Sequence, residues 1–206
     1  MSTNKAILYY VYDPMCSWCW GYKPIWEKIK QTISKDVDIV YVLGGLAPDS
    51  DEPMPQEMQT QIASYWQKIE NYLGTTFNHE FWAQNTPRRS TYPSCRAILA
   101  ARSQGAEQAM LESIQHAYYL NAKNPSDNEV LIECARNIGL NVAQFESALF
   151  SPEVHQMLLD EIAFSRSIGR RGFPSLFLKQ GEELTDLPID YEKSEGTVAL
   201  LKSCLS

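Results

Sequence analysis

The sequence predicts an α/β fold in which a large all-helical insertion separates the second and third strands of one small sheet. Two observations lead to this class. Apolar, β-branched and aromatic runs at residues 6–12 and 37–43 flank a helical pattern, and comparable strand character returns only at residues 175–187. The stretch between these halves carries helical periodicity. We therefore expect a helical insertion domain within a split sheet domain, with the three parts at residues 1–46, 47–169 and 170–206 in the order sheet, insertion, sheet.

The predicted insertion contains two cysteines, Cys95 and Cys134, which stand far apart in the sequence. The paired cysteines lie in the first part of the chain, at Cys16 and Cys19.

The first half of the sheet is predicted as a strand, a helix and a second strand. The unbroken apolar run at residues 6–12 is typical of a strand buried on both faces. Large apolar residues then recur at helical spacing, namely Ile25, Trp26, Ile29 and Ile33. The second run, at residues 37–43, stops at a pair of glycines. A helix between two such strands indicates a parallel βαβ unit.

The central stretch is predicted to be a series of helices. Prolines between residues 48 and 55 mark a linker before it. An apolar stripe follows and ends at Gly74, and its members are Met58, Ile62, Tyr65, Ile69 and Tyr72. Further helices are predicted near residues 94–104 and 106–122. Two later helices have start signals, a capping box formed by Ser126 and Glu129 and a Ser151–Pro152 pair.

Strand character returns after Gly169. Residues 175–179 form the third predicted strand, Gln180–Gly181 supplies a turn, and residues 183–187 can pair back as a hairpin. A last helix is expected near residues 192–205. Removing the central helices leaves β-α-β followed by β-β-α, which is the topology of the thioredoxin fold.

Composition excludes several kinds of partner. At 206 residues with 44% hydrophobic content, the chain can bury a core without metal or disulfide staples. The formal net charge of −7 opposes binding to phosphate backbones, so we expect no nucleic-acid partner. We expect no membrane partner either, because no apolar run approaches the roughly 18 residues of a span. The N-terminus lacks a signal-peptide pattern, which predicts a cytoplasmic location.

Cys16 and Cys19 are the residues expected to carry chemistry. Cysteines at positions i and i+3 at the start of a helix lie on one face, close enough to form and reopen a disulfide. The positive end of the helix dipole favours the thiolate form of Cys16. We therefore expect Cys16 to attack disulfides and Cys19, one turn further along, to resolve the mixed disulfide.

The segment Asp13-Pro-Met-Cys-Ser-Trp-Cys-Trp-Gly21 resembles the motif of DsbA-like disulfide oxidoreductases, including the cytosolic FrnE-like branch of predicted protein-disulfide isomerases. Gly169-Arg-Arg-Gly-Phe-Pro-Ser-Leu-Phe177 is similar to the family's Gly-x-x-Gly-Val-Pro-x-Leu segment. The resemblance implies a thioredoxin fold and makes Pro174 the candidate cis-proline beside the cysteines. Phe173 stands where many relatives have Val or Thr. We expect Phe173, Pro174 and Trp18 to contact substrate.

In one respect the sequence departs from the family pattern. No carboxylate lies within residues 6–12, where many thioredoxin-like enzymes bury an acid that helps to remove the proton of the second cysteine. Glu27 on the first helix is one candidate, although a lone helical Glu is more often solvated. The proton acceptor is left open at this stage.

The other cysteines and the histidines are not expected to take part. Cys95, Cys134 and Cys204 are isolated, and cysteines of this kind are most often buried small hydrophobes. Cys95 is the one we would test for a regulatory role. The histidines show no ligand spacing, so no metal site is expected. Arg170–Arg171 is a candidate for stabilising the thiolate or receiving a glutathione carboxylate.

The leading hypothesis is a cytoplasmic thiol-disulfide oxidoreductase acting on protein, peptide or small-thiol substrates. No bound cofactor is expected beyond the redox-active Cys16–Cys19 disulfide, and glutathione is a candidate electron partner. Two alternatives stay open. One is a glutathione-dependent isomerase or transferase, whose known relatives usually have serine at the first motif position. The other is a non-catalytic adaptor on the same scaffold.

Overall fold

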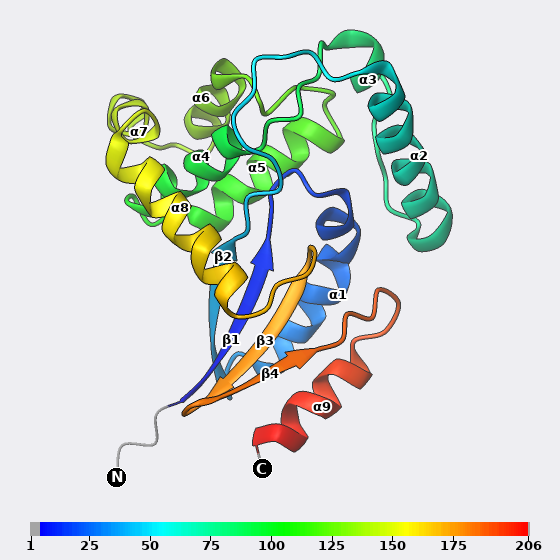
Figure 1. Ribbon diagram of the computed structural model, residues 1–206, viewed down its shortest axis with the longest axis vertical. Helices are drawn as coiled ribbons and strands as arrows, with labels where there is room; N and C mark the ends of the chain where they lie inside the picture. The colour runs from blue at the N-terminus through cyan, green and yellow to red at the C-terminus, as the bar shows by residue number, and fades with distance from the viewer. Residues whose placement is uncertain (1–4, 206) are drawn as a thin grey trace.

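The computed structural model describes residues 5–205 as a small mixed sheet with helices on both faces and a helical layer beyond one end (Figure 1). The strands of this sheet are β1 (Ala6–Tyr12), β2 (Val37–Leu43), β3 (Ser175–Gln180) and β4 (Glu183–Leu187). Their order is β2-β1-β3-β4. β1 runs parallel to β2, and β3 runs antiparallel to both β1 and β4. The predicted βαβ unit and C-terminal hairpin are therefore confirmed.

Helices cover the sheet on both sides. α1 (Ser17–Ile33) and α9 (Glu195–Leu205) lie on one face, where Trp26 of α1 stacks on Tyr10 with ring centroids 4.4 Å apart (Figure 1). α8 (Pro152–Ser167) lies on the other face, where Phe164 contacts Tyr9 with ring centroids 5.1 Å apart. Burial on both sides explains why β1 is apolar without alternation.

The chain between β2 and β3 is helical. Its helices are α2 (Gln56–Leu73), α3 (Phe81–Gln84), α4 (Tyr92–Arg102), α5 (Glu107–Tyr119), α6 (Asn128–Asn137), α7 (Val142–Leu149) and α8. Most residues of α4 are buried, and one hydrophobic cluster extends from this helix into the sheet. The thioredoxin fold with a helical insertion between the second and third strands is thus confirmed, while the division into three parts stays a prediction. Within residues 5–205, no helix has the length and apolar character needed to span a bilayer.

The predicted capping box at α6 is wrong. The Ser126 hydroxyl donates to the Ser90 carbonyl at 2.7 Å instead of capping the helix. The N-cap residue is Asp127, and its carboxylate pairs with Arg88 at 2.6 Å. Tertiary partners have therefore taken both polar side chains away from the local cap. At α8 the prediction holds, since the Ser151 side chain accepts a backbone N–H of the first turn.

The apolar stripe predicted on α2 is only partly core. Trp66, which is not a member of the stripe, is fully buried, whereas Tyr65 and Tyr72 are 42% and 49% exposed. Met58, Ile62 and Tyr65 line a cavity beside the start of α1. These residues of α2 therefore border Cys16, and Ile62 also packs against a core cluster.

Candidate active site

Cys16 and Cys19 lie where β1 passes into α1. Cys16 is the N-cap residue and has an extended backbone, with φ −80° and ψ 115°. Among the described residues no side chain caps this helix, so its first N–H groups and positive dipole end lie around Cys16. Cys16 is 7% exposed and Cys19 is 2% exposed. Burial raises the pKa of Cys19 well above the ordinary cysteine value, and a hydrogen bond with Cys16 adds to this rise. Cys16 is thus the less deeply buried of the two cysteines, and the raised pKa favours the neutral thiol form of Cys19.

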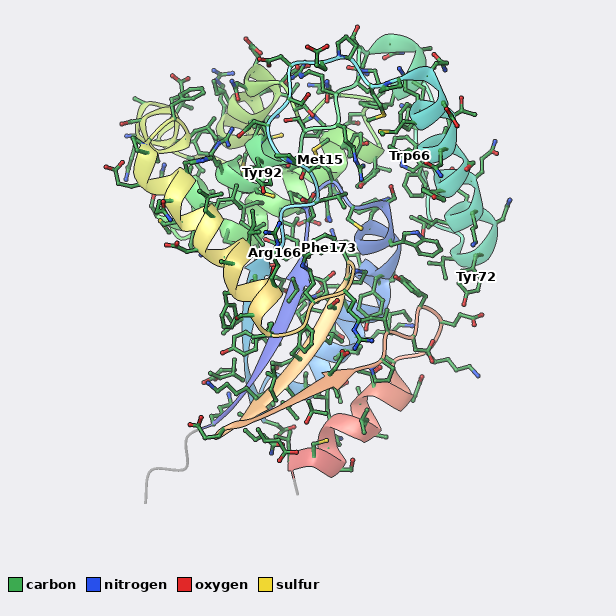
Figure 2. The ribbon with its side chains drawn as sticks, in the orientation of Figure 1. Met15, Trp66, Tyr72, Tyr92, Arg166 and Phe173 are labelled. Carbon is green, nitrogen blue, oxygen red and sulfur yellow. The ribbon has the colours of Figure 1, made fainter. Side chains whose placement is uncertain are left out.

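The loop before β3 faces Cys16. The Phe173–Pro174 peptide bond is cis, and the Phe173 carbonyl oxygen lies 3.7 Å from Cys16 Sγ. The Phe173 ring occupies space beside Gly44, where a Cβ would collide with it. Figure 2 shows Phe173 and Met15 at the junction of the sheet and the helical insertion. The fold therefore brings the proline loop and the cysteine motif together.

A buried carboxylate, Asp13, precedes the cysteines and was not predicted as a site residue. Asp13 is 0% exposed. Its Oδ1 accepts from the Met15 N–H at 2.8 Å, and its Oδ2 accepts from the Leu46 N–H and the Thr91 hydroxyl, each at 2.7 Å. The Cys95 thiol donates to the same Oδ2 at 3.5 Å. Burial raises the pKa of Asp13, while these hydrogen bonds oppose the rise. One carboxylate thus joins the loops after β1 and β2 to the start of α4.

A cavity of about 480 Å³ opens beside Cys16, and we call it the Cys16 cavity. Its large apolar lining residues are Met15, Trp18, Leu46, Met54, Met58, Ile62 and Phe173. Its basic lining residues are Arg88, Arg89, Arg170 and Arg171, and no Asp or Glu is among the described residues that line it. The cavity is therefore positively charged in a chain whose net charge is −7.

Trp18 lies at the edge of the Cys16 cavity and is half-buried. Its ring lies 5.0 Å from that of Tyr191, and the Lys68 ammonium lies 5.9 Å from its centroid. The neighbouring Ser17 hydroxyl accepts from Trp66 Nε1 at 2.9 Å. The first turn of α1 is thus fixed to α2 through Trp66, while part of the Trp18 ring stays accessible.

Of the remaining cysteines, only Cys95 contacts a residue next to the Cys16–Cys19 motif. Cys134 is buried on α6 and Cys204 is half-buried on α9, whereas Cys95 on α4 contacts Asp13. The burial of Cys95 and Cys134 agrees with the prediction for isolated cysteines. Within residues 5–205, no group of three or more His, Cys, Asp or Glu side chains is arranged to hold a metal ion.

The fold and the site define a thioredoxin-fold protein with two cysteines at the start of its first helix, of which the first lines the Cys16 cavity. Residues 9–192 match the family model described as Thioredoxin, so the chain belongs to that family. Of the solved structures similar to it, a candidate protein disulfide isomerase from Nitrosomonas europaea has a TM-score of 0.86 at 26% identity, and the match covers 98% of each chain. The resemblance to DsbA-like proteins is thereby confirmed.

Two further sets of relatives are informative. The cytosolic disulfide reductase DsbM from Pseudomonas aeruginosa has the same fold, with a TM-score of 0.78 at 23% identity over 97% of this chain and 98% of its own. The ClpXP adapter protein SpxH is 28% identical in Bacillus subtilis and 27% identical in Halalkalibacterium halodurans. Each match covers 70% of this chain and 48% or 49% of the relative, so the chain spans about half the length of these curated relatives.

Proposed function

We propose that this protein is a thiol-disulfide oxidoreductase that acts through Cys16 and Cys19. The observation that carries the proposal is the contrast between the two sulfurs. Cys16 lies at the uncapped start of α1 and lines the Cys16 cavity with its arginines, whereas Cys19 lies one turn further into the helix and does not line that cavity. A thiol at the positive end of a helix is favoured as the attacking thiolate. The names of the neighbours, a disulfide isomerase and a cytosolic disulfide reductase, support this chemistry and a cytosolic location.

The proposed reaction has two steps. The Cys16 thiolate attacks one sulfur of a substrate disulfide, so that a mixed disulfide forms and the other substrate sulfur leaves as a thiolate. Cys19 then loses its proton and attacks Cys16 Sγ, which closes the Cys16–Cys19 disulfide and releases the second substrate thiolate. The substrate disulfide has been reduced and the cysteine pair oxidised, and the reverse sequence oxidises a substrate dithiol.

Trp18, Phe173 and Pro174 supply the proposed substrate contacts. Pro174 has no N–H, and the Phe173 carbonyl is directed toward Cys16, so an extended peptide or small thiol can lie along this loop. Trp18 adds a partly exposed aromatic surface at the same cavity. These three residues therefore border the position at which a mixed disulfide would form.

The charge of the Cys16 cavity favours substrates that carry carboxylates. Glutathione disulfide fits this description, and DsbM has been solved with GSH. We expect the double change Arg89→Gln/Arg171→Gln to lower kcat/KM for glutathione disulfide by about 100-fold or more, because each arginine contributes a charged hydrogen bond of about 1.5–3 kcal/mol and every 1.4 kcal/mol is about tenfold. Activity on the uncharged hydroxyethyl disulfide should stay within about twofold by the same reasoning. Arg136→Gln on α6, outside the cavity, is the control, and equal losses on both substrates would contradict this role.

A redox titration tests the proposed function. The reduced protein is equilibrated in glutathione buffers of graded potential, and formation of the Cys16–Cys19 disulfide is followed by tryptophan fluorescence and mass spectrometry. We expect reversible two-electron oxidation, in which the ratio of oxidised to reduced protein changes tenfold for about 30 mV. The proposal fails if the two cysteines never form a reversible disulfide with each other.

A second candidate function is that of an adaptor, and the match to SpxH favours it. SpxH carries the name of a ClpXP adapter, and this chain matches about half of its length. In this role the scaffold would present a protein partner to a protease, and the thiols would be dispensable. Retention of the cellular function by a Cys16→Ser/Cys19→Ser variant would therefore favour the adaptor over the oxidoreductase.

A further inference from the structure

Several residues next to the two cysteines pack against the helical insertion. The Ser17 hydroxyl accepts a hydrogen bond from Trp66 Nε1 of α2 at 2.9 Å. Trp20 Nε1 donates to a backbone carbonyl of the loop after α2 at 3.1 Å. Gly21 lies so close to α2 that a Cβ there would come within 2.9 Å of the Ile69 side chain. The start of α1 is therefore held by α2 and by the loop that follows it.

Trp66 is itself fixed from several sides. Its side chain is fully buried, and its ring contacts Tyr118 and Tyr119 of α5, with centroids 5.4 and 5.6 Å away. It also stacks on Phe77 with ring centroids 4.9 Å apart. Figure 2 shows Trp66 on the side of α2 that faces the body of the molecule. Because a close-packed donor of this kind has little freedom to move, it can fix the hydroxyl to which it is bonded.

Ser17 lies where the start of the helix acts on Cys16. Cys16 is the N-cap residue, and Ser17 is the first residue of α1. The N–H groups of a first turn have no partner within the helix, and together with the helix dipole they favour a negative charge at the N-cap. Cys16 makes no capping hydrogen bond of its own among the described residues, so this turn depends on tertiary contacts to stay in place.

We propose that Trp66 is a positioning residue for the reactive sulfur. By holding the Ser17 hydroxyl, Trp66 keeps the first turn of α1 in the geometry in which its N–H groups stabilise the Cys16 thiolate. This inference rests on the proposed function, in which Cys16 is the attacking thiolate. The helical insertion thus takes part in the chemistry of the sheet domain, although α2 contributes no cysteine.

The charged and titratable groups around Cys16 are the same in every variant proposed below. Four arginines line its cavity from the loops before α4 and β3, and they are Arg88, Arg89, Arg170 and Arg171. On α2, Lys68 lies near Trp18. The titratable side chains come from the sheet and its loops and from α1, α2 and α5, and they are Tyr10, Asp13, Cys19, Tyr65, Tyr118, Tyr119 and Tyr191. A difference between variants in the pH profile of Cys16 therefore reports Cys16 itself.

Alkylation by iodoacetamide measures how easily Cys16 ionises, because the thiolate is the reactive form. The rate is followed from about pH 4 to about pH 9, and mass spectrometry identifies the labelled cysteine. Trp66→Phe and Ser17→Ala each remove one side of the same hydrogen bond. In both variants we expect the midpoint of the profile to lie about half a pH unit above that of the wild type, so that the rate below the midpoint falls about threefold.

Combining the two changes tests whether they act through one contact. Trp66→Phe/Ser17→Ala should shift the profile no further than either single change, because the second change has no bond left to remove. Ser17→Thr keeps a hydroxyl and should restore most of the wild-type profile. Trp82→Phe is the matched control, since the Trp82 ring contacts that of Trp66 at 5.0 Å, yet its buried Nε1 has no hydrogen-bond partner in the described part of the chain. This control should keep the wild-type profile.

The inference is overturned if Ser17→Ala keeps the wild-type profile, or if the shifts of the two single variants add in the double variant. Ser17→Ala is the smaller change, so it decides the matter even if circular dichroism shows that Trp66→Phe does not fold. In the redox titration, both single variants should be oxidised more easily, by about threefold in the equilibrium constant, because a stabilised thiolate favours the reduced pair. Alkylation needs no disulfide, so a failure of the proposed function in that titration is distinguishable from a failure of this inference.

Discussion

Cys16→Ser is expected to lower the rate of disulfide reduction by about 10³-fold or more, because it removes the nucleophile itself. The hydroxyl of serine does not ionise in the physiological range, even at the start of a helix. Insulin reduction by glutathione, with the protein as catalyst, measures the loss. The fold should persist, since a buried thiol is replaced by a hydroxyl of similar size, and near-ultraviolet circular dichroism serves as the check.

Cys19→Ser should give a different result from Cys16→Ser. The first step still takes place, but resolution does not, so the mixed disulfide accumulates at Cys16 and is visible by mass spectrometry. Cys134→Ser, which changes a buried cysteine away from the site, is the control and should leave the rate unchanged. Normal turnover by Cys16→Ser would refute the assignment of the attacking sulfur.

Asp13→Asn is expected to lower the free energy of unfolding by about 3 kcal/mol, the scale of breaking a buried charged network. The two carboxylate oxygens of Asp13 accept hydrogen bonds from the Met15 N–H on one side and from the Leu46 N–H and the Thr91 hydroxyl on the other. In either orientation, the asparagine amide places its N–H₂ group, which cannot accept, against the donors on one of these sides. Urea denaturation at neutral pH measures the change. Because Leu46 and Met15 also line the Cys16 cavity, KM should rise as well.

The titration of Asp13 makes the free energy of unfolding of the wild type fall as pH rises. Burial raises the pKa of Asp13 in the folded state, so as pH rises from about 4 the unfolded carboxyl ionises first. This contribution to the stability of the wild type is fully present below the pKa of the unfolded carboxyl. It is lost as pH rises through the higher pKa of Asp13 in the folded state. Asp13→Asn removes that dependence.

Asp49→Asn, which changes an exposed carboxylate paired with Arg96, should cost less than about 1 kcal/mol, and an equal loss in both variants would contradict the role given to Asp13.

Local sequence patterns predicted much of the scaffold. The apolar runs of β1 and β2, the helical spacing of α1 and the turn at Gln180–Gly181 depend on neighbouring residues, and the structure has these elements as expected. The same patterns could not predict what each apolar helix face packs against. The stripe on α2 is apolar both where it meets the core and where it borders the Cys16 cavity, and periodicity cannot distinguish these two surroundings.

Residue patterns along the chain were sufficient to predict the fold class, the position of the Cys16–Cys19 pair at a helix start and the proline segment that resembles the family's. The burial of Asp13 could not be predicted in this way, because its partners Leu46 and Thr91 come from distant segments of the chain. The cavities beside the two sulfurs also depend on the tertiary structure, because Cys16 lines one together with arginines and Cys19 lines another together with Glu27 and Glu112. The physical reason is that charge, burial and access depend on which distant segments meet, and spacing along the chain does not encode this.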